Sequence, residues 1–271
     1  MYLGNKKFDV KHHTYVMGIL NVTPDSFSDG GNYQHMDQAL YRAEEMIAEG
    51  ADLIDLGGES SRPGHTAISE QEELERVLPV LERLRQNFDI PLSLDTCKSS
   101  VAQAGISVGV DMINDIWGLK KDDKMQHLIA QSGVVYCLMH NRRETIPSLT
   151  VEDFLLQVQE DIQCARSAGI REEQIVLDPG IGFAKTQEQN LMILGNLERW
   201  TALGYPVLLG ASRKSVIGHV LDLPTEQRLE GTLATTATAV MSRCGFVRVH
   251  DVKENVRFIQ MMEQIRAQRS G

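Results

Sequence analysis

Polar residues capable of acid, amide or cation chemistry recur along this sequence, each directly after a short apolar run. In chain order they are Asn21, Glu59 to Arg62, Asp95, Asn114 with Asp115, His140, Asp178, Ser212 to Lys214, and Arg248 with His250. Taken singly, each has a simpler interpretation, because Asp and Asn commonly cap helices and turns. Eight such coincidences are harder to assign to capping alone, so we treat these residues as one candidate site.

Two kinds of chemistry are mixed in this set. Asp95, Asn114 and Asp178 offer carboxylate and amide groups that can pair with the N–H edge of a planar heterocycle. A second group suits an anion such as phosphate or pyrophosphate. Its members are Asn21, Arg62, Arg213, Lys214, Arg248 and His250. A site with both halves would bind a phosphorylated heterocycle.

Several other kinds of site are not expected, because their motifs are absent. The sequence has no Walker loop, no G-x-G-x-x-G, no G-x-S-x-G elbow and no H-E-x-x-H. The motif Gly180-Ile181-Gly182 is too short to indicate nucleotide binding. The serines of the early loops have no adjacent histidine. Covalent serine chemistry and structural zinc are therefore not expected.

The elements that would position these groups follow from hydrophobic periodicity. Strands are expected within residues 14–20, 51–57, 90–95, 110–116, 133–140, 174–180, 205–212 and 245–251. Between them, segments such as 36–50, 70–87 and 151–169 carry apolar residues three and four apart, as amphipathic helices do. Gly50, Gly133 and Gly169 stand where such helices would stop.

Strand and helix alternate eight times within 271 residues, which favours an α/β fold of the (β/α)8 TIM-barrel type in a single domain, residues 1–271. A doubly wound open sheet is the competing architecture. In a barrel the carboxyl ends of all strands meet at one face, which would gather the polar groups. The loops after the first two strands are long, and we expect them to be mobile and functional.

Composition narrows the choice of partner. The formal net charge of −10 and the pI near 5.3 argue against nucleic acid. No run approaches the roughly 18 apolar residues that span a bilayer, and the first residues lack a signal-type apolar stretch, so a cytoplasmic protein without a membrane partner is expected. Cys97, Cys137, Cys164 and Cys244 form no C-x-x-C pair and are expected to be buried free thiols.

The segments that carry the polar groups resemble those of a known family. The chain contains GILNVTPDSFSDGG, GGESSRPG, SLDT, NDI, MH, LDPGIGF, SRKS and RVHD, in this order between Gly18 and Asp251. On these motifs, which span nearly the whole chain, it is similar to the dihydropteroate synthases. The first segment is among the most specific, because many barrels end their first strand in Asn but few continue with TPDSFSDGG.

The resemblance implies an activity and a set of partners. Members of this family are (β/α)8 barrels, usually homodimers, that join 6-hydroxymethyl-7,8-dihydropterin pyrophosphate to para-aminobenzoate, releasing pyrophosphate and forming 7,8-dihydropteroate for folate biosynthesis. For this chain it therefore implies these two small-molecule substrates, Mg2+ as cofactor, a dissociative SN1-like substitution and a homodimer. The dimer-forming helix is expected within residues 231–246.

The resemblance also implies roles for individual residues. The pterin ring would be bound by Asp95, Asn114, Asp178 and Lys214. The pyrophosphate would be bound by Asn21, Arg248 and His250, with Mg2+ beside Asn21. The aminobenzoate pocket would be formed by Phe27, Ser61, Arg62, Pro63, Phe183 and Ser215. Asp29 would organise the first loop, a lid over residues 22–31, and the residues expected to be catalytic are Asp95, Lys214, Arg248 and His250.

One departure and two alternatives accompany this interpretation. Ser61 stands where the family usually has Thr, which keeps the hydroxyl and removes a methyl group, so packing should change while chemistry should not. A pterin-binding methyltransferase-type module shares the barrel and the acidic residues, but it has no need of TPDSFSDGG, ESSRPG and SRKS together. A catalytically inactive barrel acting as a binding protein would be favoured by loss of Asn21, Lys214 or Arg248, and all three are present.

Overall fold

The computed structural model describes residues 1–22, 32–59 and 67–268, and of residues 32–35 only the backbone. Its strands are β1 Tyr2–Leu3, β2 Lys6–Lys7, β3 Tyr15–Asn21, β4 Leu53–Gly57, β5 Leu92–Asp95, β6 Met112–Asp115, β7 Val135–Met139, β8 Ile175–Asp178, β9 Leu208–Leu209 and β10 Phe246–Val249. Its helices are α1 Asn32–Glu49, α2 Glu70–Asn87, α3 Ser99–Val108, α4 Asp123–Ser132, α5 Val151–Ser167, α6 Gln187–Leu194, α7 Leu197–Thr201, α8 Ser215–Leu221, α9 Leu229–Met241 and α10 Val252–Gln268. Short 3-10 turns cover Glu172–Gln174 and Thr225–Gln227.

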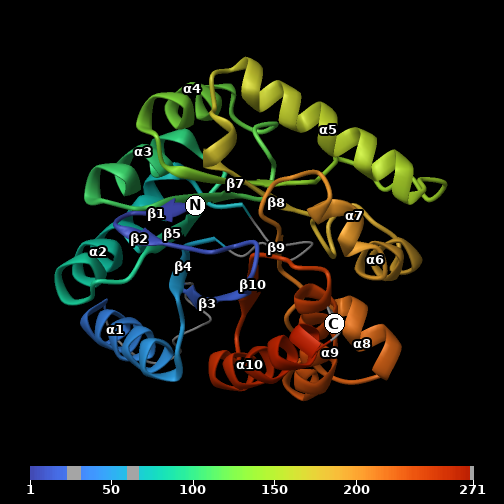
Figure 1. Ribbon diagram of the computed structural model, residues 1–271. Coiled ribbons are helices and arrows are strands. Elements are labelled where there is room, and N and C mark those ends of the chain that lie inside the picture. Colours follow the sequence, from blue (N-terminus) through green and yellow to red (C-terminus); the bar gives the residue numbers. More distant parts are fainter. Residues whose placement is uncertain (23–31, 60–66, 269–271) are drawn as a thin grey trace.

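Eight parallel strands form a nearly closed barrel surrounded by helices (Figure 1). Their order is β8-β7-β6-β5-β4-β3-β10-β9, so each strand lies beside its neighbour in the alternating βα pattern. The ends of the series meet through a parallel bridge between Leu177 and Val207, and the Leu177 amide donates to the Pro206 carbonyl at 2.8 Å. The predicted barrel is confirmed, and the open doubly wound sheet is wrong.

Local sequence signals account for several element boundaries. The side chain of Ser69 accepts from the Glu72 amide at the start of α2, and Thr150 with Asp153 forms a reciprocal capping box at the start of α5. Gly133 ends α4 with a φ of 76°, which the absent β-carbon makes inexpensive. All eight strands expected from the apolar runs are present.

The first ten residues form a structure that periodicity did not predict. Strands β1 and β2 pair as a short antiparallel hairpin over the middle of the strand ring (Figure 1). Leu3 and Phe8 are buried against barrel-interior residues such as Met17 and Phe246. The hairpin therefore closes the end of the barrel at which the strands begin, and its two-residue strands are too short to produce a periodic signal.

The prediction that the cysteines are free thiols is confirmed, and the prediction that all of them are buried is wrong at one position. All four cysteines are free, and Cys97, Cys137 and Cys244 are buried. Cys164 is exposed, because it lies on the solvent side of the amphipathic helix α5. Within the described part of the chain, no helix is long and apolar enough to cross a membrane.

Candidate active site

The carboxyl ends of the strands are lined with polar side chains above small residues. Gly57 ends β4, and a methyl group there would lie 3.4 Å from Asn21 Oδ1 and 3.6 Å from Asp95 Cβ. A methyl group on Gly210 would lie 3.5 Å from Asp178 Oδ2 and 3.9 Å from Lys214 Nζ. Glycine at these two positions lets the four predicted side chains lie close to the backbone at the strand ends.

Arg248 joins three strands across the barrel interior. Its Nε donates to Asp55 Oδ2 at 2.6 Å, and its Nη2 donates to Asp95 Oδ2 at 2.9 Å. Asn114 Nδ2 donates to the same Asp55 oxygen at 3.3 Å. Asp55 is fully buried and Asn114 is 3% exposed. With both carboxylates ionised, the cluster carries a net charge of −1, which favours a cationic or N–H-rich ligand above it.

Burial shifts the pKa values of the acidic and basic groups toward one another. The pKa of Asp95 is raised to about 7, mainly by burial. The Asp55 charge adds to this shift, and the Arg248 charge opposes it. Burial also raises the pKa of Asp178, against the influence of Lys214. It lowers the pKa of Lys214 to about 8, in part opposed by Asp178. Asp95 and Lys214 thus have pKa values of about 7 and about 8, and shifted pKa values of this kind are typical of active sites.

Lys214 lies between Asp178 and the turn after β8. Its Nζ donates to the Ile181 carbonyl at 2.7 Å and lies 4.6 Å from the centre of the Phe183 ring. The Gly180 amide donates to Asp178 Oδ1 at 2.7 Å, which ties the same turn to the carboxylate. Asp178, Lys214 and Phe183 are therefore brought together, as the motifs suggested.

His250 lies at the rim formed by the segments after β9 and β10. Its backbone amide donates to Ser212 Oγ at 3.2 Å, and that oxygen lies 3.0 Å from His250 Nδ1. If the Ser212 hydroxyl donates to Nδ1, the neutral ring carries its proton on Nε2. Arg42 of α1 donates to the His250 carbonyl at 3.1 Å. The loop is thus held from two sides.

The two remaining predicted residues within the described ranges lie at the edge of the site. Asn21 is exposed at the end of β3. Ser215 is exposed at the start of α8, directly after Lys214. Phe27, Asp29, Ser61, Arg62 and Pro63 lie outside the described residues, as does the predicted lid apart from Val22.

Three residues of the initial polar set, Asp115, His140 and Arg213, form hydrogen bonds or an ion pair with other residues of the protein. Asp115 accepts from the Trp117 and Leu119 amides and from the Tyr136 hydroxyl. His140 is buried against Gln157, and burial lowers its pKa to about 3, so it is neutral. Arg213 forms a two-point ion pair with Asp251. These three side chains thus have protein partners in the structure, while Asn114 and Lys214 remain the candidates at the ends of β6 and β9.

Sequence reasoning missed Asp55, which lies within β4 rather than at its end. All five residues of the strand Leu53–Gly57 are buried. A carboxylate inside such a run needs a cationic or hydrogen-bonding partner, because a lone buried charge is very costly. That interruption of an apolar strand was the available signal for a buried partner of Arg248.

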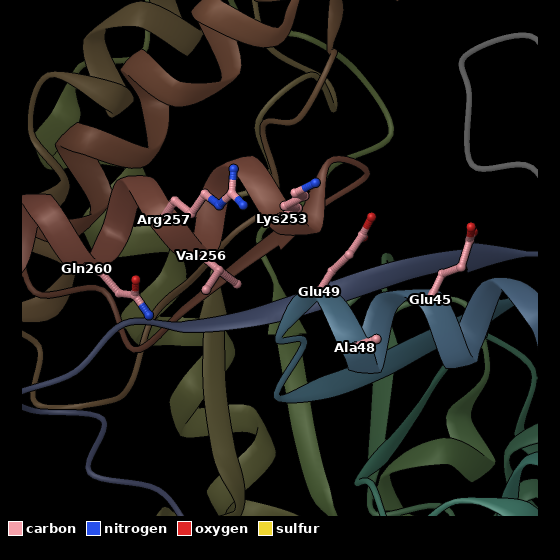
Figure 2. Close-up of a pocket in the computed structure, with 7 residues that line it drawn as sticks. All are labelled: Glu45, Ala48, Glu49, Lys253, Val256, Arg257 and Gln260. Atoms are coloured by element: carbon pink, nitrogen blue, oxygen red, sulfur yellow. The ribbon is translucent and has the colours of Figure 1, made fainter.

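A separate pocket lies on the outer wall of the barrel, between α1 and α10 (Figure 2). It is lined by Glu45, Ala48, Glu49, Lys253, Val256, Arg257 and Gln260. Acidic side chains come from α1 and basic ones from α10. It shares no lining residue with the strand-end site.

Among the described residues, no cluster of three or more His, Cys, Asp or Glu side chains could hold a metal ion.

Comparisons with known proteins agree with the geometry. Residues 17–250 match the model of the pterin binding enzyme family. The chain is 53% identical over 266 residues to the dihydropteroate synthase of Clostridium beijerinckii, covering 98% of this chain and 99% of that one. The structure is similar to that of the Clostridium difficile dihydropteroate synthase in the presence of pteroic acid, with a TM-score of 0.92, 48% identity and coverage of 96% and 99%. It is also similar to the Xanthomonas albilineans dihydropteroate synthase with 4-aminobenzoic acid, with a TM-score of 0.90, 39% identity and 94% coverage of each chain.

Proposed function

The chain belongs to the dihydropteroate synthase family and is a transferase of folate biosynthesis, and from this premise we propose how its residues divide the reaction. The substrates are 6-hydroxymethyl-7,8-dihydropterin pyrophosphate and para-aminobenzoate. Support for this pair comes from pteroic acid and 4-aminobenzoic acid, which accompany two similar enzymes. The observation that carries the proposal is the gathering of two acid–base pairs at the strand ends, Asp95 with Arg248 and Asp178 with Lys214, whose charges act on one another.

Asp95, Asn114, Asp178 and Lys214 bind the pterin ring. The Oδ1 atom of Asn114 is buried without a partner among the described residues, which supports a ligand N–H group as its missing donor. Asp178 keeps its second oxygen, Oδ2, directed at the space above Gly210. An ionised carboxylate there accepts from the amidine-like edge of the ring.

The bond between the pterin methylene carbon and the pyrophosphate oxygen breaks before the new C–N bond forms. The departing oxygen takes the electron pair, which leaves a cation conjugated with the ring. The ionised Asp95, next to Asp55, stabilises that cation electrostatically. The arylamine nitrogen is a neutral nucleophile, so no strong general base is needed, and its proton leaves to solvent after attack.

Arg248, His250 and Asn21 bind the pyrophosphate end. The carboxylates of the described chain occupy Nε and Nη2 of Arg248, which leaves Nη1 for an anion. His250 offers Nε2–H when Nδ1 accepts from Ser212. These donors strengthen their interaction as negative charge accumulates on the leaving group.

Mg2+ fits this site as an ion that arrives with the substrate. Asn21 is exposed at the end of β3, and its Oδ1, a hard oxygen donor, lies 3.4 Å from the position of a methyl group on Gly57. Mg2+ is commonly bound by one or two protein oxygens together with substrate phosphates, so a cluster of three acidic residues is not required. When bound, the ion would neutralise charge on the leaving pyrophosphate.

Phe183 and Ser215 form part of the aminobenzoate pocket, and Phe27, Ser61, Arg62 and Pro63 complete it, with Asp29 organising the first loop. Phe183 already contacts Lys214, so its ring lies at the boundary between the pterin and aminobenzoate ends.

We also propose a cytoplasmic homodimer that uses α9. Light scattering on the purified protein would measure the mass, and a monomeric mass at micromolar concentration would reject the dimer.

The direct test of the activity follows pyrophosphate release by the purified protein with Mg2+ and the pterin pyrophosphate. The expected result is release that depends on para-aminobenzoate, with dihydropteroate as the product by chromatography. Tight pterin binding without release would instead support a binding module or an inactive barrel. Pyrophosphate release at the same rate with and without para-aminobenzoate would reject para-aminobenzoate as the second substrate.

A further inference from the structure

We propose that Lys185 is a positioning residue, whose ammonium group sets the turn 180–183 that presents Phe183 and Lys214 to the substrates. This inference rests on the roles proposed above for these two side chains. Lys185 Nζ donates to three backbone carbonyls: His140 at 3.1 Å, Gly180 at 2.9 Å and Phe183 at 2.9 Å. It thereby joins the end of β7 to both ends of the turn.

The turn connects this ammonium group to the active site in three ways. The Gly180 amide donates to Asp178, the Ile181 carbonyl accepts from Lys214, and the Phe183 ring lies beside the Lys214 ammonium group. A shift of the turn would therefore move the acceptor of Lys214 and the aromatic wall together. Lys185 itself forms no described contact with Lys214, so it acts through the turn.

The geometry calls for a group with several donors and a positive charge. Gly180 has a φ of 68°, and a methyl group on it would lie 2.1 Å from the His140 carbonyl oxygen, so the turn is pressed against the end of β7. Carbonyl oxygens converge at this contact, and their dipoles repel one another without a donor between them. A lysine ammonium supplies three N–H donors from one atom. A side chain without donors would take away the Lys185 hydrogen bonds of the His140 and Phe183 carbonyls, whereas the Gly180 carbonyl also accepts from the Phe183 amide at 3.1 Å.

The charge of Lys185 depends on its surroundings. Its pKa is lowered to about 7, mainly by burial; the Asp178 charge opposes this shift, and the charges of Lys214 and Arg142 add to it. His140, whose carbonyl it binds, is neutral because burial also lowers the pKa of that imidazole. From α5, the Phe154 ring lies 5.8 Å from the Lys185 ammonium group, Gln157 binds His140, and Asp161 forms an ion pair with Arg142. Deprotonation above neutral pH would remove one donor and the positive charge from the carbonyl cluster.

A second restraint makes the test practicable. The Gly182 amide donates to Asn190 Oδ1 at 2.7 Å, so part of the turn is held independently of Lys185. Replacement of Lys185 by a neutral residue of similar length should therefore loosen the turn and leave the barrel folded. The matched surface control is Lys124, an exposed lysine at the start of α4.

The test compares Lys185→Met, Lys185→Arg and Lys124→Met by steady-state kinetics at pH 7. Lys185→Met should raise the KM for para-aminobenzoate about tenfold, the scale of one weakened hydrogen bond to a charged group. The KM for the pterin pyrophosphate should rise less, by about twofold to threefold, since Lys214 and Asp178 contact the turn but strands β5, β6 and β10 hold Asp95, Asn114 and Arg248 independently of it. Lys185→Arg, which keeps the charge, should restore most of the loss, and Lys124→Met should match the parent.

The pH profile supplies a readout that a purely structural role would not change. In the parent, the KM for para-aminobenzoate should rise between pH 7 and pH 8.5, and this rise should be smaller in Lys185→Arg, because guanidinium stays protonated. Asp95, Asp178 and Lys214 titrate in both proteins, so the difference between the two profiles reports the charge at position 185, including its influence on Asp178 and Lys214. If the parent is active and Lys185→Met keeps both KM values, or the two pH profiles coincide, the inference is overturned. An inactive parent would instead reject the proposed function. Should Lys185→Met fail to fold, the profiles of the parent and Lys185→Arg still decide.

Discussion

Replacement of Asp55 by Asn tests whether a strand-interior carboxylate controls the active-site acid. The variant keeps the shape of the side chain and removes its charge from the fully buried contact with Arg248 Nε. Two consequences follow from that one change: a loss of stability, because the guanidinium loses its carboxylate partner and bonds a neutral amide, and a lower pKa of Asp95, because the Asp55 charge raises it.

The stability effect can be estimated from the contact. A hydrogen bond to a charged group contributes about 1.5 to 3 kcal/mol, and Arg248 keeps Asp95 as its partner. With an unfolding entropy of about 2.1 cal/mol/K per residue, the 271 residues give about 0.57 kcal/mol/K. The free-energy loss therefore corresponds to a fall in Tm of about 3 to 5 °C.

The activity effect has a definite sign. The proposed mechanism requires ionised Asp95, whose pKa lies near 7, so kcat/KM for the pterin pyrophosphate should rise with pH up to about 7. It also requires protonated Lys214, whose pKa lies near 8, so kcat/KM should fall above about pH 8. In Asp55→Asn the acidic limb should move to lower pH, whereas the alkaline limb should stay in place as an internal reference.

The assay combines thermal denaturation with the pH dependence of kcat/KM. The control is Asp52→Asn, in the turn before the same strand, where the side chain accepts only the Val16 amide at 2.8 Å and an amide oxygen can replace it. The control should keep the parent pH profile. An acidic limb that does not move in Asp55→Asn would refute the proposed electrostatic link, and an unchanged Tm would refute the estimate from the contact.

Other substitutions test separate parts of the site. Asp95→Asn should abolish turnover while circular dichroism stays native, and measurable pyrophosphate release would remove the residue from the mechanism. Lys214→Ala should behave alike, and retained activity would reject its role. Arg248→Ala should weaken binding of the pterin pyrophosphate in titration calorimetry and lower Tm, because Asp55 is left buried without its cation; unchanged affinity would contradict the anion site. Gly210→Ala should fold, since the new methyl group meets nothing closer than 3.5 Å, but it should raise the pterin KM about tenfold by occupying the open space. A parent-like KM there would show that the ring lies elsewhere.

The barrel was accessible to sequence reasoning because its strands are buried on both faces. Such strands give continuous apolar runs, and the helices between them give clear amphipathic faces. Polar residues at strand ends then identify the open face. The same reasoning overestimated His140, because position after a strand does not determine whether a side chain turns toward the barrel mouth or toward a helix such as α5.

What sequence reasoning could not supply was pairing across the barrel. Asp55 and Arg248 are 193 positions apart, and only the closed sheet brings them into contact. Lys185 was also missed, because a lysine beside a glycine turn is ordinarily solvated, and its three carbonyl partners come from the fold. The N-terminal hairpin was not predicted for a different reason: its two-residue strands are too short to show a hydrophobic periodicity.

The contact of Arg248 with both Asp55 and Asp95 limits how this enzyme can evolve. One guanidinium connects β10 to β4 and β5 and is also proposed to meet the leaving group. A substitution at any of the three positions would impair folding and turnover together, and a stabilising change elsewhere would repair only the first defect. Inherited variation in substrate or inhibitor preference should therefore accumulate in the loops between strands and helices, while this three-residue cluster stays invariant among functional descendants.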